Sequence, residues 1–72
     1  MEQKNISPNC IGIVGLGLIG GSLGLDLQAQ GFQVHGLVHR ATTAQKAKER
    51  DLAQVISTDT QILADCDLII LA

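Results

Sequence analysis

The stretch Gly15-Leu16-Gly17-Leu18-Ile19-Gly20 decides how this chain is expected to fold, because glycine stands at its first, third and last positions. An apolar run from Cys10 to Val14 leads directly into it, and such a run is typical of a strand buried on both faces of a sheet. A helical pattern begins at Leu18 and extends to Gln30. The sequence therefore predicts a strand, a tight glycine turn and a helix, in that order.

The expected helix carries one apolar stripe, since Ile19, Leu23 and Leu27 recur every four residues. Gly31 follows it at the position where glycine most often ends a helix. Beyond Gly31 we expect strands over 32–38, 54–57 and 67–72 and helices over 44–50 and from Thr58 or Asp59 to 64. Thr42 or Thr43 is positioned to cap the helix over 44–50.

Strands that alternate with short helices imply parallel strands joined by right-handed crossovers. The expected fold is therefore α/β, a doubly wound parallel sheet with the strand order 3-2-1-4. The last strand is apolar and would form a bare sheet edge, which natural proteins avoid. We therefore expect further strands to follow, so that the chain is the N-terminal half of a domain and is truncated.

Each glycine of the motif has its own role in a Rossmann-type domain that binds a dinucleotide. Gly15 makes the tight turn, Gly17 lets the pyrophosphate approach the backbone, and Gly20 lets the helix lie close to the sheet. The phosphates are expected on free N–H groups at the start of the helix, where Leu18 and Ile19 stand. We thus expect a partial dinucleotide-binding domain over residues 10–72 and a flexible lead-in over residues 1–9.

The end of the second expected strand indicates which dinucleotide is bound. NAD-binding domains place an acidic residue on the ribose about 20 residues after the motif, and that position falls on Val38 or His39 here. Arg40 comes next, and an arginine fork with nearby hydroxyls binds a 2′-phosphate. We therefore expect NADP rather than NAD, with Arg40 as the main contact and His39 and Thr42 as further ones. The alternative is that Arg40 is a solvated loop residue.

The remaining cysteine, aspartate and histidine residues that could in principle act in catalysis or bind a metal are expected to have structural roles. Cys10 and Cys66 have no ligand at zinc spacing, so they are interpreted as small core residues, and no metal site is predicted. Their sulfurs would lie near each other if the first and fourth strands were neighbours. Asp65 and Asp67 precede the fourth strand, whereas ligands bind where strands end, so both are expected in caps and turns. His35 is interpreted as a histidine of the core or of a sheet face.

Composition excludes several classes of protein. The chain has 72 residues, a net charge of −2 and 46% hydrophobic residues. Its five basic residues form no stripe that could follow a nucleic-acid backbone, so nucleic acid is not an expected partner. No apolar stretch approaches the ~20 residues that cross a bilayer, and the first residues lack the apolar region of a signal peptide. A cytoplasmic location is expected.

The stretch from Ile13 to Leu23, IVGLGLIGGSL, resembles the first turn of prephenate and arogenate dehydrogenases. The segment Cys66–Ala72 is similar to their fourth strand, although many Rossmann enzymes share that pattern. The resemblance implies an NADP-dependent dehydrogenase that oxidatively decarboxylates arogenate or prephenate in tyrosine biosynthesis. It also implies that the catalytic residues and a helical, dimer-forming domain lie beyond the fourth strand. No catalysis is therefore expected from this chain alone, and the parent enzyme is expected to be a homodimer.

Two other interpretations remain open from the sequence. One is a different Rossmann oxidoreductase, of the β-hydroxyacid dehydrogenase or pyrroline carboxylate reductase type, which would share the glycine turn. The other is a nucleotide-sensing regulatory module of the potassium-transport type, which would bind a nucleotide and catalyse nothing. Such a module would be expected to have an acidic residue at the end of the second strand, where Val38, His39 and Arg40 stand.

Overall fold

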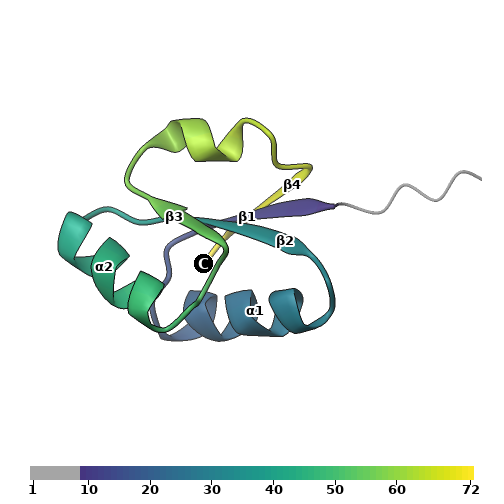
Figure 1. Cartoon of the computed structure of the whole chain (residues 1–72). Helices are drawn as coiled ribbons and strands as arrows, with labels where there is room; N and C mark the ends of the chain where they lie inside the picture. The colour runs from purple at the N-terminus through teal and green to yellow at the C-terminus, as the bar shows by residue number, and fades with distance from the viewer. Residues whose placement is uncertain (1–8) are drawn as a thin grey trace, which may run out of the picture.

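The computed structural model describes residues 9–72, so nearly all of the predicted lead-in lies outside the described residues. A parallel sheet has the strand order β3-β2-β1-β4, which confirms the predicted topology (Figure 1). Its strands are β1 (Cys10–Val14), β2 (Gln33–Leu37), β3 (Val55–Ser57) and β4 (Leu68–Leu71). The helices are α1 (Leu18–Ala29), α2 (Ala41–Glu49) and a 3-10 turn, η1 (Thr60–Leu63).

The helices α1 and α2 cover one face of the sheet, and η1 lies over the other (Figure 1). The hydrophobic core lies between the sheet and the two longer helices. Ile13 of β1 and Val34 of β2 are both 0% exposed at its centre, and Ala44 and Ala47 of α2 and Ile56 of β3 surround them. Because β-branched residues fit a pleated sheet and alanine allows close helix approach, this composition lets the helices pack closely on the sheet.

Helix α1 packs on the sheet largely through its glycines, which differs from the predicted stripe. Leu23 and Leu27 pack against the core as expected, but Ile19 is 77% exposed. Successive residues four apart rotate by about 40° around a helix, so a stripe at this spacing drifts away from the buried face. Gly20 and Gly24 are buried instead, and a Cβ on Gly24 would overlap the carbonyl oxygen of Leu52.

Helix α2 begins three residues earlier than the prediction of residue 44, at Ala41, and neither Thr42 nor Thr43 caps it. The N-cap is Arg40, whose backbone is extended and whose side chain makes no capping hydrogen bond. The first turn closes when the N–H of Ala44 donates to the carbonyl of Arg40, at 3.0 Å. Both threonines are thereby inside the first turn, where a hydroxyl cannot act as the N-cap.

Two other helix ends agree with the sequence. Gly31 has a φ of +95°, and its N–H donates to the carbonyl of Gln28, as in a glycine-terminated helix. Asp59 caps η1, because its carboxylate accepts a hydrogen bond from the N–H of Gln61 at 2.9 Å. The end of α1 and the start of η1 are thus fixed by local hydrogen bonds.

The Gln54 side chain extends the pairing of β2 with β3. Its Oε1 accepts from the buried N–H of Val34 at 2.7 Å, and its Nε2 donates to the carbonyl of Phe32 at 3.3 Å. Gln54→Ala would leave the Val34 N–H without this partner, so we expect the free energy of unfolding to fall by about 1–3 kcal/mol. Urea denaturation measures this. Gln45→Ala, at an exposed position of α2, should change stability by less than about 0.5 kcal/mol. Equal losses in both variants would contradict the assignment.

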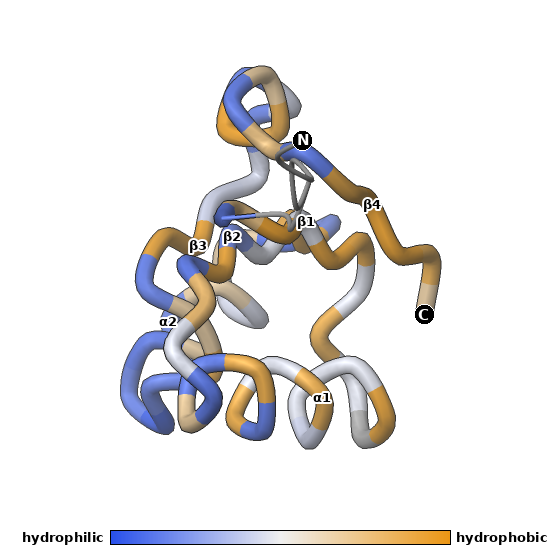
Figure 2. Tube along the Cα trace, turned by 90° about the vertical axis from the view of Figure 1, so that its right-hand side faces the viewer, coloured by the Kyte–Doolittle hydropathy of each residue, from blue (hydrophilic) through white to orange (hydrophobic). Residues whose placement is uncertain are grey.

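Strand β4 is apolar along its length (Figure 2) and pairs with β1 through residues Leu68–Leu71. Its side chains are poorly covered, and Leu71 is 80% exposed. Within residues 9–72, no strand lies on the outer side of β4, as the predicted bare edge requires. None of the helices in this described part combines the length and apolar character that crossing a bilayer requires.

Candidate functional site

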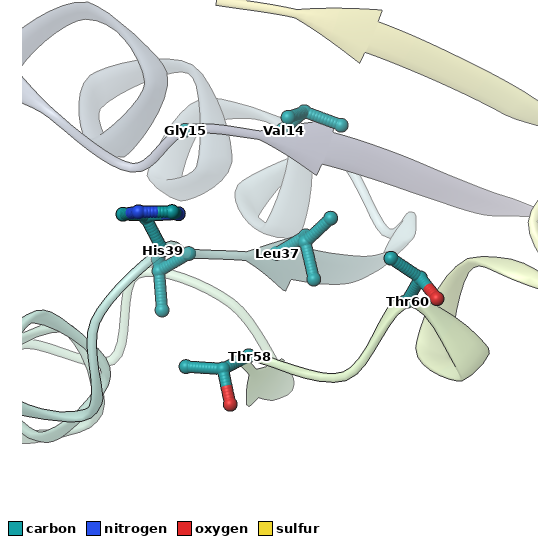
Figure 3. Close-up of a pocket in the computed structure, with 7 residues that line it drawn as sticks. Val14, Gly15, Leu37, His39, Thr58 and Thr60 are labelled. Carbon is teal, nitrogen blue, oxygen red and sulfur yellow. The ribbon is translucent and has the colours of Figure 1, made fainter.

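A cleft of about 270 Å³ opens at the carboxyl ends of β1, β2 and β3 (Figure 3). Ligands of doubly wound sheets bind at this end, outside the ends of the strands. The cleft is lined by residues of the segments that leave the three strands, namely Val14, Gly15, Leu37, Val38, His39, Thr58 and Thr60. The predicted site residues Gly15 and His39 therefore share one cleft, although they stand far apart in the sequence.

Gly15 forms the turn that brings the chain from β1 into the cleft. Its φ of +96° lies in the left-handed region, which side chains other than glycine rarely adopt. Its N–H donates to the carbonyl of Leu37 at 2.8 Å, so the ends of β1 and β2 are joined at this point. The predicted tight turn is confirmed, and its backbone geometry explains why glycine is needed there.

Gly17 is the N-cap of α1, is exposed, and has no side-chain capping partner. A Cβ built on it would have no atom of residues 9–72 within 4 Å apart from its own chain neighbours, so the space beside its backbone is open to a ligand. The first N–H groups of a helix, here those at Leu18 and Ile19, have no partner inside the helix. These N–H groups and the positive end of the helix dipole form a suitable environment for an anion.

Gly20 is buried against the turn that precedes its helix. A Cβ at this position would overlap the carbonyl oxygen of Gly15 and would lie 3.2 Å from the Cβ of Ala72. The close approach expected at the third glycine is therefore present, and it is made to the Gly15 turn at the end of β1. This contact holds the start of α1 directly beside the cleft.

The residues after β2 divide between the cleft and the surface. Val38 is buried and His39 is exposed, and the His39 imidazole points toward the turn at Gly15 (Figure 3). Arg40 and Thr42 are exposed at the start of α2 and do not line the cleft. Within residues 9–72 the Arg40 guanidinium forms no hydrogen bond or ion pair, and no carboxylate stands at this strand end.

Thr58 and Thr60 line the cleft but were not expected from the sequence. The signal that could have identified them is their position directly after the third strand, since the residues that follow each parallel strand lie at the same end of the sheet, where the strands have their carboxyl ends.

A larger cleft of about 600 Å³ lies between α1 and α2, where Gly17 and Ser22 face Thr43, Lys46 and Arg50. The glycine turn therefore borders both clefts, with Gly15 at the smaller one and Gly17 at the larger one.

The acidic residues before β4 have the structural role that was predicted for at least one of them. Asp67 Oδ2 accepts hydrogen bonds from the N–H groups of Asn9 and Cys10, at 2.9 and 3.1 Å. This carboxylate thus fixes the start of β1, at the amino end of the strands and away from the cleft. Asp65 is exposed in the turn that precedes it.

Comparison with known proteins agrees with this geometry. Residues 10–72 match the family model described as the NAD binding domain of 6-phosphogluconate dehydrogenase. The crystal structure of Synechocystis arogenate dehydrogenase is similar, with a TM-score of 0.81 and 40% sequence identity. That match covers 86% of this chain and 22% of the Synechocystis chain, and it confirms the resemblance carried by the glycine motif. No curated protein sequence matches significantly.

The family match spans all four strands and the glycine turn, and the cleft lies where such domains hold a dinucleotide. The chain therefore belongs to the family of NAD-binding domains typified by that of 6-phosphogluconate dehydrogenase.

Proposed function

We propose that this chain is the cofactor-binding part of an NADP-dependent dehydrogenase. The observation that carries the proposal is the end of β2, where His39 and Arg40 replace the acidic residue that would bind the ribose of NAD. A carboxylate there would repel a 2′-phosphate, whereas a free guanidinium attracts it. The choice of NADP over NAD therefore depends on Arg40, with His39 and Thr42 as nearby secondary contacts.

The site fits a dinucleotide in three respects. The turn of Gly15 opens the cleft, the uncapped start of α1 offers N–H groups at Gly17, Leu18 and Ile19 for the pyrophosphate, and the open space at Gly17 gives it room. His39 borders the same cleft, so the adenosine would lie between it and the residues after β3. When bound, the nicotinamide accepts a hydride from the substrate.

We further propose that the substrate is arogenate or prephenate, which would be oxidatively decarboxylated in tyrosine biosynthesis. The similarity to Synechocystis arogenate dehydrogenase supports this, but the chain spans only 22% of that enzyme. We assign residues 9–72 to cofactor binding and assign none of them to the chemical step. NADP reduction by the purified enzyme with each of the two substrates tests this proposal, as absence of turnover with both would refute it.

Arg40→Ala tests the cofactor assignment. A charge-assisted contact with the 2′-phosphate contributes about 1.5–3 kcal/mol, so the Kd for NADP should rise about tenfold to 150-fold. The Kd for NAD, which lacks this phosphate, should change little. Isothermal titration with both dinucleotides gives the ratio of affinities. The fold should tolerate the change, since Arg40 is exposed and makes no capping hydrogen bond.

Arg50→Ala is the matched control, because it removes the same charge from the other end of α2, beside the larger cleft. It should leave both Kd values nearly unchanged. If Arg50→Ala lowers the affinity for NADP and Arg40→Ala does not, the 2′-phosphate binds in the cleft between α1 and α2 and not at Arg40. Equal losses for NADP and NAD in the Arg40 variant would show that the guanidinium does not contact the 2′-phosphate.

A further inference from the structure

Cys10, His35 and Cys66 gather at the amino end of the sheet, on the face covered by η1. One ligand atom from each lies within 4.8 Å of the others, and the two sulfurs are 3.3 Å apart. The three residues come from β1, β2 and the turn before β4, which the β2-β1-β4 pairing brings together. The predicted proximity of the sulfurs is confirmed, but the histidine was not expected beside them.

A backbone carbonyl fixes the tautomer of His35. Its Nδ1 lies 2.6 Å from the carbonyl oxygen of Ile62, and because a carbonyl only accepts, Nδ1 must carry the proton and donate it. The lone pair is then on Nε2, and the Gln33 amide, at 3.5 Å from it, is too far for a strong hydrogen bond. An imidazole held through Nδ1–H by a carbonyl is the usual arrangement of a histidine that ligates a metal.

The surroundings of the sulfurs carry negative charge. Asp67 follows Cys66 directly in the chain, and its carboxylate accepts a hydrogen bond from the N–H of Cys10 at 3.1 Å. A carboxylate beside both cysteines attracts a cation.

We propose that Cys10, Cys66 and His35 form a site for a single Zn²⁺-type ion that joins β1, β2 and the start of β4. Two sulfurs and one nitrogen supply three of the four donors of a tetrahedral Zn²⁺ site, which leaves the fourth position to solvent, and donors around such an ion lie roughly 3.5–3.8 Å apart. The two sulfurs are 3.3 Å apart and one imidazole nitrogen lies within 4.8 Å of both, so the side chains would have to shift to bring the sulfurs and Nε2 to this spacing.

The site lies at the amino ends of the strands, whereas the nucleotide cleft lies at their carboxyl ends. Its role would therefore be to stabilise the fold. An ion that binds only the folded protein stabilises it by an amount that rises with the logarithm of the ratio of its concentration to the Kd. Titration of the metal-free protein with Co²⁺, under a phosphine reductant, should produce thiolate-to-cobalt charge-transfer absorption at one ion per chain. Added Zn²⁺ should remove this absorption and raise the Tm.

Variants separate this site from any other place where a metal binds. Cys66→Ser should reduce the charge-transfer absorption per bound Co²⁺ to about half or less, because one of the two thiolates is lost, and His35→Gln should weaken Co²⁺ binding by at least about tenfold. His39→Gln is the matched control and should bind Co²⁺ as the unchanged protein does, because His39 lies at the other sheet edge. NADP binding and circular dichroism should be unchanged in Cys66→Ser and His35→Gln, which shows that a lost metal site does not reflect unfolding.

Four results would overturn the proposal. The first is absence of charge-transfer absorption in the folded, reduced protein. The second is absorption of undiminished intensity in Cys66→Ser, which would place the ion elsewhere. The third is equal weakening in the His35 and His39 variants. The fourth is that mild peroxide joins the two sulfurs with loss of two hydrogens and Co²⁺ does not protect them, which would make the pair a redox couple.

Discussion

Ile13→Ala should lower the free energy of unfolding by about 2–5 kcal/mol, the loss typical of a large aliphatic side chain removed from a closed core. Ile13 is 0% exposed, and its Cδ1 lies on the side of Gly24 in α1 where a Cβ on that glycine would be 3.7 Å away. The cavity would sit between β1 and α1, where glycine cannot fill it. Urea denaturation followed by circular dichroism measures the change.

The matched control is Ile19→Ala, which removes the same atoms from a side chain that is 77% exposed. It should alter the free energy of unfolding by less than about 0.5 kcal/mol. A small domain has a total stability of about 5–15 kcal/mol, so the Ile13 variant could lose a large share of it. Similar losses for both isoleucines would mean that the core does not lie between β1 and α1.

Gly17→Ala should sharply weaken nucleotide binding while leaving the fold intact. A methyl group at this position would occupy the open space beside Gly17 through which, in our proposal, the pyrophosphate would reach the start of α1. If it displaces two charge-assisted hydrogen bonds, the loss is about 3–6 kcal/mol, which raises the Kd for NADP at least about 100-fold. NAD binding should fall by a similar factor, since both dinucleotides share the pyrophosphate. Isothermal titration with each dinucleotide measures both values.

Stability separates this effect from damage to the fold. The φ of Gly17 is −77°, which alanine adopts readily, and no protein atom lies near its added methyl group, so unfolding should change by no more than about 1 kcal/mol. Gly20→Ala is the contrasting variant, because its methyl group would overlap the Gly15 carbonyl and so destabilise the protein. Retained NADP affinity in folded Gly17→Ala would refute the proposed phosphate site.

Local patterns were sufficient where one short segment decides its own conformation. The buried run Cys10–Val14, the positive φ of Gly15 and the glycine that ends α1 all follow from side-chain size and backbone freedom within a few residues. The alternation of strands and helices then fixed the order β3-β2-β1-β4, because right-handed crossovers leave few alternatives. The parts of the cleft that lie in the glycine turn and after β2 were predictable for the same reason.

Errors arose where contacts between distant segments outweighed local preference. Thr42 appeared suited to a cap, but burial of Ala44 and Ala47 against the sheet extends α2 back to Ala41. Ile19 matched the helical period, yet α1 turns its glycines toward the sheet because they permit the closest backbone approach. Neither the start of α2 nor the buried face of α1 can be predicted from its own segment, since each depends on how the helix packs against the sheet.

The sequence by itself therefore determined the fold class, the glycine turn and the absence of an acidic residue at the end of β2, all properties of contiguous residues. Only the tertiary structure decided that Thr58 and Thr60 join His39 around one cleft and that His35 lies beside Cys10 and Cys66. The physical reason is that parallel pairing aligns residues far apart in the chain at the same sheet edge. The spacing of these residues along the sequence does not predict which of them are aligned in this way.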